Sequence, residues 1–315
     1  MPARGQGVIN DTEFQQALNS LQTARDCLRW GESALRRGEV FLGHGTDDPW
    51  DEVLGLLLHV LNLPWDTDPR MLDARLLPLE VEAFARLLRQ RVNKRVPAAY
   101  LTGEAWFCGL PFKVDKRVLI PRSPIAELIE RGFTPFVDPE SVSRVLDLCT
   151  GSGCIAIACA HAFPDAQVDA SDISREALAV CQSNIERHGL QGRVHAVESD
   201  GLSKLEGLYD LIVSNPPYVD AEDMASVPRE YRHEPVLALA SGDDGLDFTR
   251  QLLKQAADYL APGGVLVCEV GNSAPALEAA FPEVPFMWLE FERGGEGVFL
   301  LTREQLVEHQ ADFAA

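Results

Sequence analysis

The tetrapeptide Asn215-Pro-Pro-Tyr218 combines residue types that can hold the amino group of a substrate. The Asn215 side chain carries a carbonyl acceptor, and each proline leaves a backbone carbonyl without an N–H donor beside it. Because Asn215 and Pro216 each precede a proline, steric clashes drive both residues towards extended backbone. Two acceptors fixed side by side can bind both hydrogens of an NH2 group. The same residues also form ordinary turns, so the neighbouring sequence has to decide between the two interpretations.

A second candidate site is the glycine-rich segment Asp147-Leu-Cys-Thr-Gly-Ser-Gly153. It begins within a short apolar run and leads into a predicted helix. Its two glycines let the backbone approach a ligand at the N-terminus of the next helix. Asp172 follows about 20 residues later, the spacing at which an acidic side chain accepts the ribose hydroxyls of a bound nucleotide. A cap of the following helix is the alternative role for Asp172. Asp200 is either an adenine contact or a solvated loop carboxylate.

Strands and helices alternate from residue 144 to the end of the chain. Strands are predicted at 145–149, 167–171, 193–197, 209–214, 265–270, 286–290 and 298–301. This alternation predicts an α/β fold with a doubly wound, Rossmann-like sheet of seven strands, and the turn residues 292–297 make the last strand antiparallel. In such sheets, ligands bind beyond the carboxyl ends of the strands. We therefore expect the glycine-rich segment, Asp172 and Asn215 to lie close together.

The first hundred residues follow a helical pattern without strands. Apolar residues recur at helical spacing in 11–28, in 48–61 and from residue 78 to the basic run 89–95, for which we expect a solvated helix end. Aromatic and branched residues on both sides of a Gly-Leu-Pro turn then predict a hairpin. We predict three parts: a helical domain that recognises the substrate (1–102), a β-hairpin and linker (103–124), and an α/β domain that binds the ligand of the glycine-rich segment (125–315).

The charge balance of the 315 residues is strongly acidic, with 28 basic and 48 acidic residues and a net charge of −20. Such a surface repels phosphate backbones and attracts basic proteins, so we expect no sequence-specific nucleic-acid partner. The seven cysteines form no C-x-x-C pair, which predicts reduced thiols and no metal site. The chain begins without an apolar signal segment and has no apolar run of membrane-spanning length. We therefore expect a cytoplasmic protein without membrane contact.

Together these motifs resemble the Asn-Pro-Pro-Tyr class of S-adenosylmethionine-dependent methyltransferases, and within it the glutamine N5-methyltransferases that modify translation proteins. The resemblance covers nearly the whole chain and extends to Phe107-Cys-Gly-Leu-Pro-Phe112, Ile120-Pro-Arg122, Glu234-Pro235 and Gly242-Asp-Asp-Gly-Leu246. Two features differ from the release-factor branch: Cys149 and Pro121-Arg-Ser-Pro-Ile-Ala-Glu127. Together with Tyr231-Arg-His-Glu-Pro235 and Cys268-Glu-Val-Gly-Asn272, they resemble the ribosomal branch, which methylates a glutamine of the large-subunit protein uL3.

The resemblance implies S-adenosyl-L-methionine as cofactor, S-adenosyl-L-homocysteine as product and a glutamine of a basic ribosomal protein as methyl acceptor. The cofactor contacts that it implies are Asp147, Cys149, Thr150, Gly151, Gly153, Asp172, Ile173, Asp200 and Asn215. The catalytic residues that it implies are Asn215, Pro216, Pro217 and Tyr218. The substrate contacts that it implies are Phe107, Arg122, Asn215, Pro216, Tyr218 and Glu234.

Individual roles also follow from the resemblance. In this family the asparagine side chain and the carbonyl of the next proline grip the glutamine amide, which implies these roles for Asn215 and Pro216. We expect Tyr218 beside the amide, Phe107 either in the pocket wall or in the core, and Glu234 as a residue that holds its loop.

Three alternative functions stand beside this one. The first is a release-factor glutamine methyltransferase. The second is an adenine-N6 nucleic-acid methyltransferase, because the same tetrapeptide can grip an exocyclic amine; the acidic net charge argues against it. The third is a binding module that keeps the cofactor but not the activity, against which the intact motifs argue.

Overall fold

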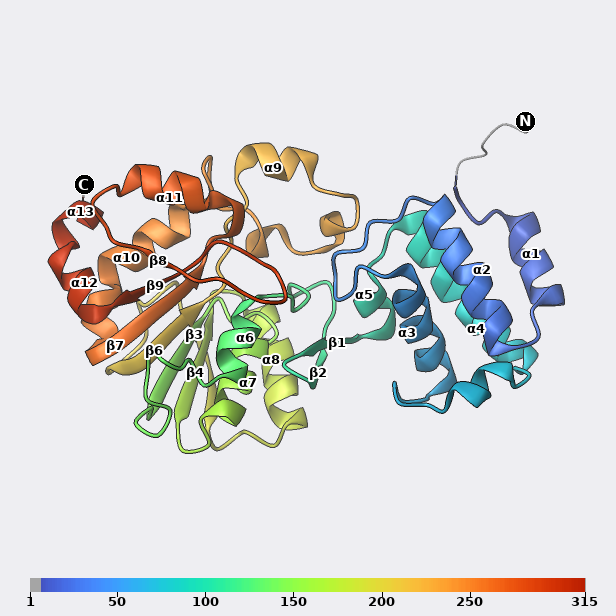
Figure 1. The fold of residues 1–315 in the computed structure, drawn as a ribbon, viewed down its shortest axis with the longest axis horizontal. Helices are drawn as coiled ribbons and strands as arrows, with labels where there is room; N and C mark the ends of the chain where they lie inside the picture. Colours follow the sequence, from blue (N-terminus) through green and yellow to red (C-terminus); the bar gives the residue numbers. More distant parts are fainter. Residues whose placement is uncertain (1–6, 315) are drawn as a thin grey trace. The chain divides into compact units, whose positions relative to one another are not determined.

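The structure, a computed structural model, describes residues 7–314 and divides the chain into two compact units. The helical unit comprises Met1–Glu104 together with Pro228–His233, and the sheet unit comprises Ala105–Val227 and Glu234–Ala315. Both units are drawn in Figure 1. No helix among residues 7–314 combines the length and the apolar composition that a bilayer crossing requires.

Residues 7–104 of the helical unit form five α-helices, a 3-10 turn and a π-helical turn, and Tyr231–His233 adds a second 3-10 turn. Their bounds are α1 Asp11–Ser20, α2 Ala24–Arg37, α3 Pro49–Leu61, a 3-10 turn Pro69–Asp73, α4 Pro78–Arg89, a π-helical turn Gln90–Lys94 and α5 Ala98–Thr102. The predicted continuous helix over 11–28 is wrong, because the backbone of Leu21 is extended. Thr23 then begins α2 by accepting a hydrogen bond from Asp26 N, while the Asp26 side chain accepts one from Thr23 N.

The basic run 89–95 does not end in solvent as predicted. Arg91 is fully buried and donates to Glu52 Oε1 at 2.8 Å, to the Phe41 carbonyl at 2.6 Å and to Glu230 Oε1 at 3.4 Å. A buried guanidinium needs carboxylate partners, and Glu52 and Glu230 supply them. Glu230 thereby joins Pro228–His233 to the helical unit, although these residues follow the tetrapeptide Asn215-Pro-Pro-Tyr218 and were predicted to belong to residues 125–315.

The sheet unit contains a seven-stranded sheet in the order β5-β4-β3-β6-β7-β9-β8. The bounds are β3 Arg144–Leu148, β4 Gln167–Asp172, β5 Val194–Glu198, β6 Tyr209–Ser214, β7 Leu260–Glu269, β8 Met287–Trp288 and β9 Val298–Thr302. Strands β3 to β7 pair in parallel, and β9 is antiparallel to both β7 and β8. The predicted α/β fold class is confirmed.

Alternate residues of each strand face opposite sides of the sheet and make two hydrophobic cores. Val145 and Leu211 belong to the core shared with α6 Ile125–Glu130, α7 Cys154–Ala162 and α8 Arg175–Arg187. The neighbouring strand positions contribute to the core on the other side (Figure 1), which is shared with α10 Asp247–Tyr259, α11 Ala274–Ala280, α12 Arg303–Glu308 and α13 Gln310–Ala314. The remaining helix, α9 Ala221–Ser226, follows β6 and buries none of its residues. Helices on both faces bury all but one residue of each of the central strands β3 and β6.

The predicted hairpin is formed by β1 Glu104–Phe107 and β2 Leu110–Lys113. Its two turn residues, Cys108 and Gly109, both have positive φ angles, as a tight two-residue hairpin turn requires. The side chain of Asn184 in α8 accepts from Lys113 N at 2.7 Å and donates to the Lys113 carbonyl at 3.0 Å. This pair of bonds holds β2 against α8.

Candidate active site

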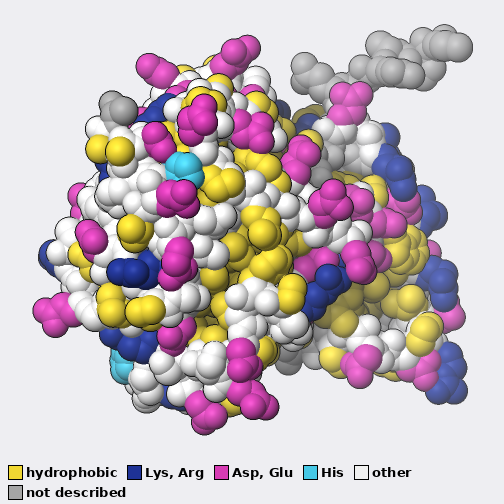
Figure 2. All heavy atoms as spheres, turned by 60° about the vertical axis from the view of Figure 1, so that its left-hand side comes forward, with side chains coloured by type: hydrophobic (Ala, Val, Ile, Leu, Met, Phe, Trp, Pro, Cys, Tyr) yellow, Lys and Arg dark blue, Asp and Glu magenta, His cyan; other side chains and the backbone are white. Residues whose placement is uncertain are grey.

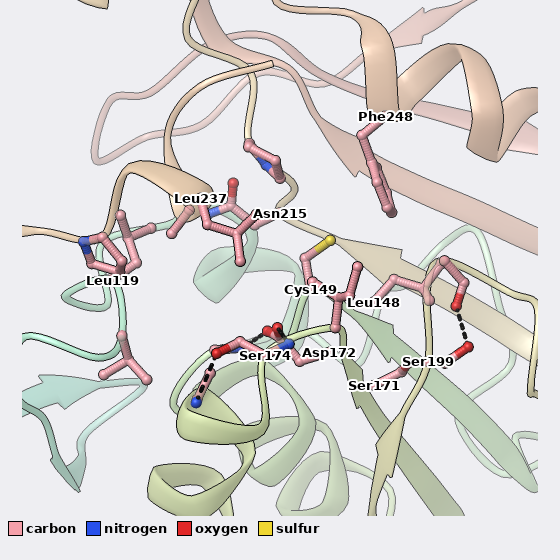
Figure 3. A pocket seen from close by; sticks show the side chains of 18 of the residues that line it. Leu119, Leu148, Cys149, Ser171, Asp172, Ser174, Ser199, Asn215, Leu237 and Phe248 are labelled. Atoms are coloured by element: carbon pink, nitrogen blue, oxygen red, sulfur yellow. Dashed lines mark hydrogen bonds between the residues drawn. The ribbon is translucent and has the colours of Figure 1, made fainter. Parts of the chain in front are cut away.

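A cavity of about 230 Å³ lies at the carboxyl ends of β3, β4 and β6 (Figure 3). The strand order reverses between β3 and β6, which is where open α/β sheets bind ligands. The residues predicted for the site that line this cavity are Cys149, Gly151, Asp172, Ile173, Asp200, Asn215 and Pro217. Most of the remaining wall is apolar and includes Leu119, Leu237 and Phe248, which spacing and motifs had not singled out. Apolar walls around a few polar groups are typical of a small-molecule site.

The glycine-rich segment turns sharply between β3 and α7. Gly153 is the N-cap of α7 with a φ of +81°, and a Cβ atom there would lie 2.6 Å from the Cys181 sulfur. Any side chain at this position would therefore push the turn away from α8. The Thr150 N–H donates to the Ser171 carbonyl at 2.9 Å, so the turn is held against the end of β4.

Asp172 is the last residue of β4 and borders the cavity. Its Oδ2 accepts from Gly151 N at 2.9 Å, and its Oδ1 accepts from Ser174 N at 2.8 Å. Burial raises the pKa of this carboxyl above its ordinary value, and the backbone donors partly oppose that shift. Asp172 thus supports the start of α8 as well as facing the cavity, while Ser174 itself caps the helix by accepting from Ala177 N.

Asp147 lies beneath the glycine-rich turn, outside the lining of the cavity. Its Oδ2 accepts from the Thr150 hydroxyl and from Ala156 N, the latter at 3.0 Å. Its Oδ1 is buried without a hydrogen-bond partner among the residues that the structure describes. Burial raises the pKa of Asp147 to about 7. A buried acceptor without a partner calls for an explanation, and a donor group on a bound ligand would supply one.

Asn215 follows β6 directly and projects into the cavity opposite Asp172 (Figure 3). Ser214 donates from its hydroxyl to the Leu148 carbonyl at 3.0 Å and so ties the end of β6 to the end of β3. Within residues 7–314 the Asn215 side chain makes no hydrogen bond, which leaves its amide group available to a ligand. Pro216 is buried behind it, whereas Pro217 reaches the cavity wall.

Tyr218 lies outside the cavity lining and is held by side chains from β7 and the turn after it. Its hydroxyl donates to Glu269 Oε1 at 2.8 Å, and its carbonyl accepts from the Ser273 hydroxyl at 2.8 Å. Glu269 was not among the predicted site residues. It ends the apolar strand β7, so the rule that functional groups gather at carboxyl ends of strands would have found it.

Arg122 and Glu234, both predicted as substrate contacts, bind each other. The Arg122 guanidinium donates to Glu234 Oε1 at 2.7 Å and to Oε2 at 2.9 Å. Glu234 Oε1 also accepts from Ile120 N at 2.9 Å, which fits its predicted role of holding the loop. Phe107 packs in the core with Phe112 and Ile125, so of its two predicted positions the structure places it in the core.

Residues 133–231 match the model of the methyltransferase small domain. A crystal structure of a methyltransferase from Pyrococcus furiosus resembles the chain with a TM-score of 0.46 and 21% identity, covering 62% of this chain and 89% of that one.

Two curated relatives match almost the entire chain. The ribosomal protein uL3 glutamine methyltransferase of Neisseria gonorrhoeae is 52% identical over 295 residues, which cover 93% of this chain and 99% of the relative. The protein of the same name from Neisseria meningitidis is also 52% identical, with coverage of 93% and 97%. Identity at this level over both units, together with a site built around Asn215-Pro-Pro-Tyr218, places the chain in the ribosomal protein uL3 glutamine methyltransferase family.

Proposed function

We propose that this protein methylates the side-chain amide nitrogen, N5, of a glutamine in ribosomal protein uL3. The observation that carries the proposal is the 52% identity to relatives named for this activity, over 93% of the chain. The predicted enzyme class, an S-adenosylmethionine-dependent methyltransferase, is confirmed by the same relatives and by the matching methyltransferase model.

S-adenosylmethionine fits the residues around the cavity. It carries a positively charged sulfonium and an amino group, and the cavity offers the Asp172 carboxylate. Oδ1 of Asp147, beneath the glycine-rich turn, has no hydrogen-bond partner among the residues that the structure describes. We assign the ribose hydroxyls to Asp172, the adenine amino group to Asp200 and the adenine ring to the apolar wall. When bound, the cofactor supplies a methyl group that is activated by the sulfonium charge.

Asn215 and Pro216 are assigned to the acceptor amide. An amide nitrogen is a weak nucleophile because its lone pair is delocalised into the carbonyl, so orientation contributes most to the rate. The Asn215 side-chain carbonyl and the Pro216 backbone carbonyl accept the two N–H groups and fix the direction of the nitrogen. Asn215 suits this role because its side-chain amide lines the cavity and makes no hydrogen bond within residues 7–314. It lies on the side of the cavity opposite Asp172.

The charge of the protein supports a basic substrate. The net charge is −20, and Asp and Glu side chains are spread over the face shown in Figure 2. A ribosomal protein binds RNA phosphates and therefore carries complementary positive charge, which speeds encounter with an acidic enzyme. We assign recognition of this partner to the helical unit, none of whose described residues lines the cavity. We place the reaction in the cytoplasm.

The test is to incubate the protein with labelled S-adenosylmethionine and four separate acceptors: unmethylated uL3, a release factor, naked ribosomal RNA and DNA. Mass spectrometry of tryptic peptides then locates the label. We expect one methyl group on a glutamine of uL3. Label on the release factor alone would move the protein to the sister branch, and label on naked nucleic acid would overturn the acceptor assignment.

A further inference from the structure

Glu269 has a connection to the acceptor side of the site that the proposed reaction does not yet use. It is the last residue of β7 and only 5% exposed. One carboxylate oxygen, Oε1, accepts from the Tyr218 hydroxyl at 2.8 Å, and the other, Oε2, accepts from the Ser123 hydroxyl at 2.6 Å. Both oxygens therefore bind hydroxyl groups from other parts of the chain. Tyr218 precedes Glu269 by 51 residues, and Ser123 precedes it by 146 residues.

Ser123 belongs to the segment 120–124, which we call the strap. Its hydroxyl also accepts from Ile125 N at 3.2 Å, at the start of α6. The other end of the strap is held by Glu234, which accepts from Ile120 N and pairs with Arg122. The strap is thus fixed at both ends by acidic side chains that lie later in the sequence.

Tyr218 is restrained at three points. Its hydroxyl is held by Glu269 and its carbonyl by Ser273, as described for the site. Its ring lies against the bare backbone of Gly271, where φ is +46° and an added Cβ would come within 2.6 Å of the ring. The ring direction is therefore set by tertiary contacts and not by the tetrapeptide itself.

Burial of a carboxylate at this position destabilises the folded protein unless hydrogen bonds offset the loss of hydration. Burial raises the pKa of Glu269, whereas the bonds from Ser123 and Tyr218 favour the ionised form. A glutamine or an apolar residue would fill the same space with a smaller desolvation cost. An ionised glutamate, however, offers a separate oxygen to each of the two hydroxyl hydrogens, whereas a glutamine has one acceptor oxygen.

We propose that Glu269 is a positioning residue that fixes Tyr218 and the strap on the acceptor side of the site. The inference rests on the proposed function, because it takes Asn215-Pro-Pro-Tyr218 as the acceptor grip. Glu269 acts through Tyr218 and is not among the residues that line the cavity.

The experiment compares Tyr218→Phe, Glu269→Gln, Glu269→Leu and the double variant Tyr218→Phe/Glu269→Gln. With saturating S-adenosylmethionine, we expect each single variant to lower kcat for uL3 methylation by about tenfold, as for coupled neighbouring groups. Glu269→Gln should retain more activity than Glu269→Leu, because glutamine keeps one acceptor. The double variant should be no slower than the slower single variant, since both changes act on the same Tyr218–Glu269 bond.

The matched control is Tyr209→Phe at the other end of β6. The Tyr209 hydroxyl donates to Asp169 Oδ2 at 2.7 Å, which is the same kind of tyrosine–carboxylate bond away from the cavity. We expect this variant to keep kcat, whatever happens to its melting temperature. Losses of kcat that multiply in the double variant, or equal losses in the Tyr209 control, would overturn the proposal.

A spectroscopic readout separates this inference from the proposed function. The chain has five tyrosines, so ring-labelled tyrosine gives an NMR spectrum in which single Phe variants identify Tyr218 and Tyr209. We expect Glu269→Gln to shift the Tyr218 signal and leave the Tyr209 signal in place. If this shift appeared but the wild-type protein did not methylate uL3, the proposed function would be wrong. The Tyr218–Glu269 contact would still be confirmed. An unmoved Tyr218 signal would refute the positioning role itself.

Discussion

The cofactor side of the cavity and its acceptor side are held together by different kinds of bonds. On the cofactor side, Asp172 accepts hydrogen bonds from backbone N–H groups of Gly151 and Ser174. On the acceptor side, side chains bind side chains: Arg122 pairs with Glu234, and Tyr218 with Glu269. A backbone N–H donor keeps its position when the side chain of its own residue is replaced. Where two side chains bind each other, replacing one leaves the other without its hydrogen bond. A substitution should therefore act locally on the cofactor side and spread further on the acceptor side.

The largest effect is expected from Asn215→Ala, which removes an acceptor of the methyl-receiving amide. We expect kcat/KM for uL3 to fall by about 1,000-fold, the upper range for loss of one positioned polar group. The dissociation constant of S-adenosylhomocysteine, measured by calorimetry, should stay within about twofold. An equal loss of cofactor binding would show that the two sides are not separable at this residue.

The next effect is expected from Glu234→Gln, which leaves the Arg122 guanidinium without its bidentate partner. Because the Glu234 side chain is fully buried, we expect the free energy of unfolding to fall by about 3 kcal/mol in urea denaturation. The matched control is Glu198→Gln, which breaks the exposed pair with Arg175 and should cost much less. If the two costs were similar, the acceptor side would not depend on this pair.

A smaller effect is expected from Asp172→Asn on the cofactor side. Loss of the charged acceptor should weaken S-adenosylmethionine binding by about 30-fold, while kcat at saturating cofactor should change little. Initial rates over a range of cofactor concentrations at fixed uL3 measure both quantities. A fall in kcat with unchanged cofactor affinity would place Asp172 on the acceptor side of the comparison.

The smallest effect on the reaction is expected at Asp147, whose contribution concerns stability and its pH dependence. Its folded pKa of about 7 lies above the unfolded value near 4, so the folded protein binds this proton more tightly. The stabilisation is present below pH about 4 and is lost as the pH rises to about 7. Over this range, the unfolding free energy should therefore fall less steeply with pH in Asp147→Asn than in the wild-type protein. The difference in slope corresponds to at most one proton, or about 1.4 kcal/mol per pH unit. Identical slopes in both proteins would contradict the raised pKa.

The cofactor side could be predicted because its bonds are local or follow the order of the strands. The alternation of strands and helices fixed the fold class, and the distance from Gly153 to Asp172 placed the acid next to the glycine-rich turn. The cap of α8 is local in the same way, since Ser174 accepts from Ala177 N, three residues away. The positions of Cys149, Gly151 and Asp172 in one cavity agree with these expectations.

The sequence by itself determined the sheet, the glycine-rich turn, the tetrapeptide that follows β6 and the family to which these motifs belong. Only the tertiary structure decided the partners of the buried charges: Glu234 with Arg122, Glu269 with Tyr218 and Ser123, and Glu230 with Arg91. Spacing identifies neighbours that are three, four or about twenty residues apart. It does not encode which of many acidic residues meets an arginine or a hydroxyl 51 to 146 residues away, because that depends on strand order and packing.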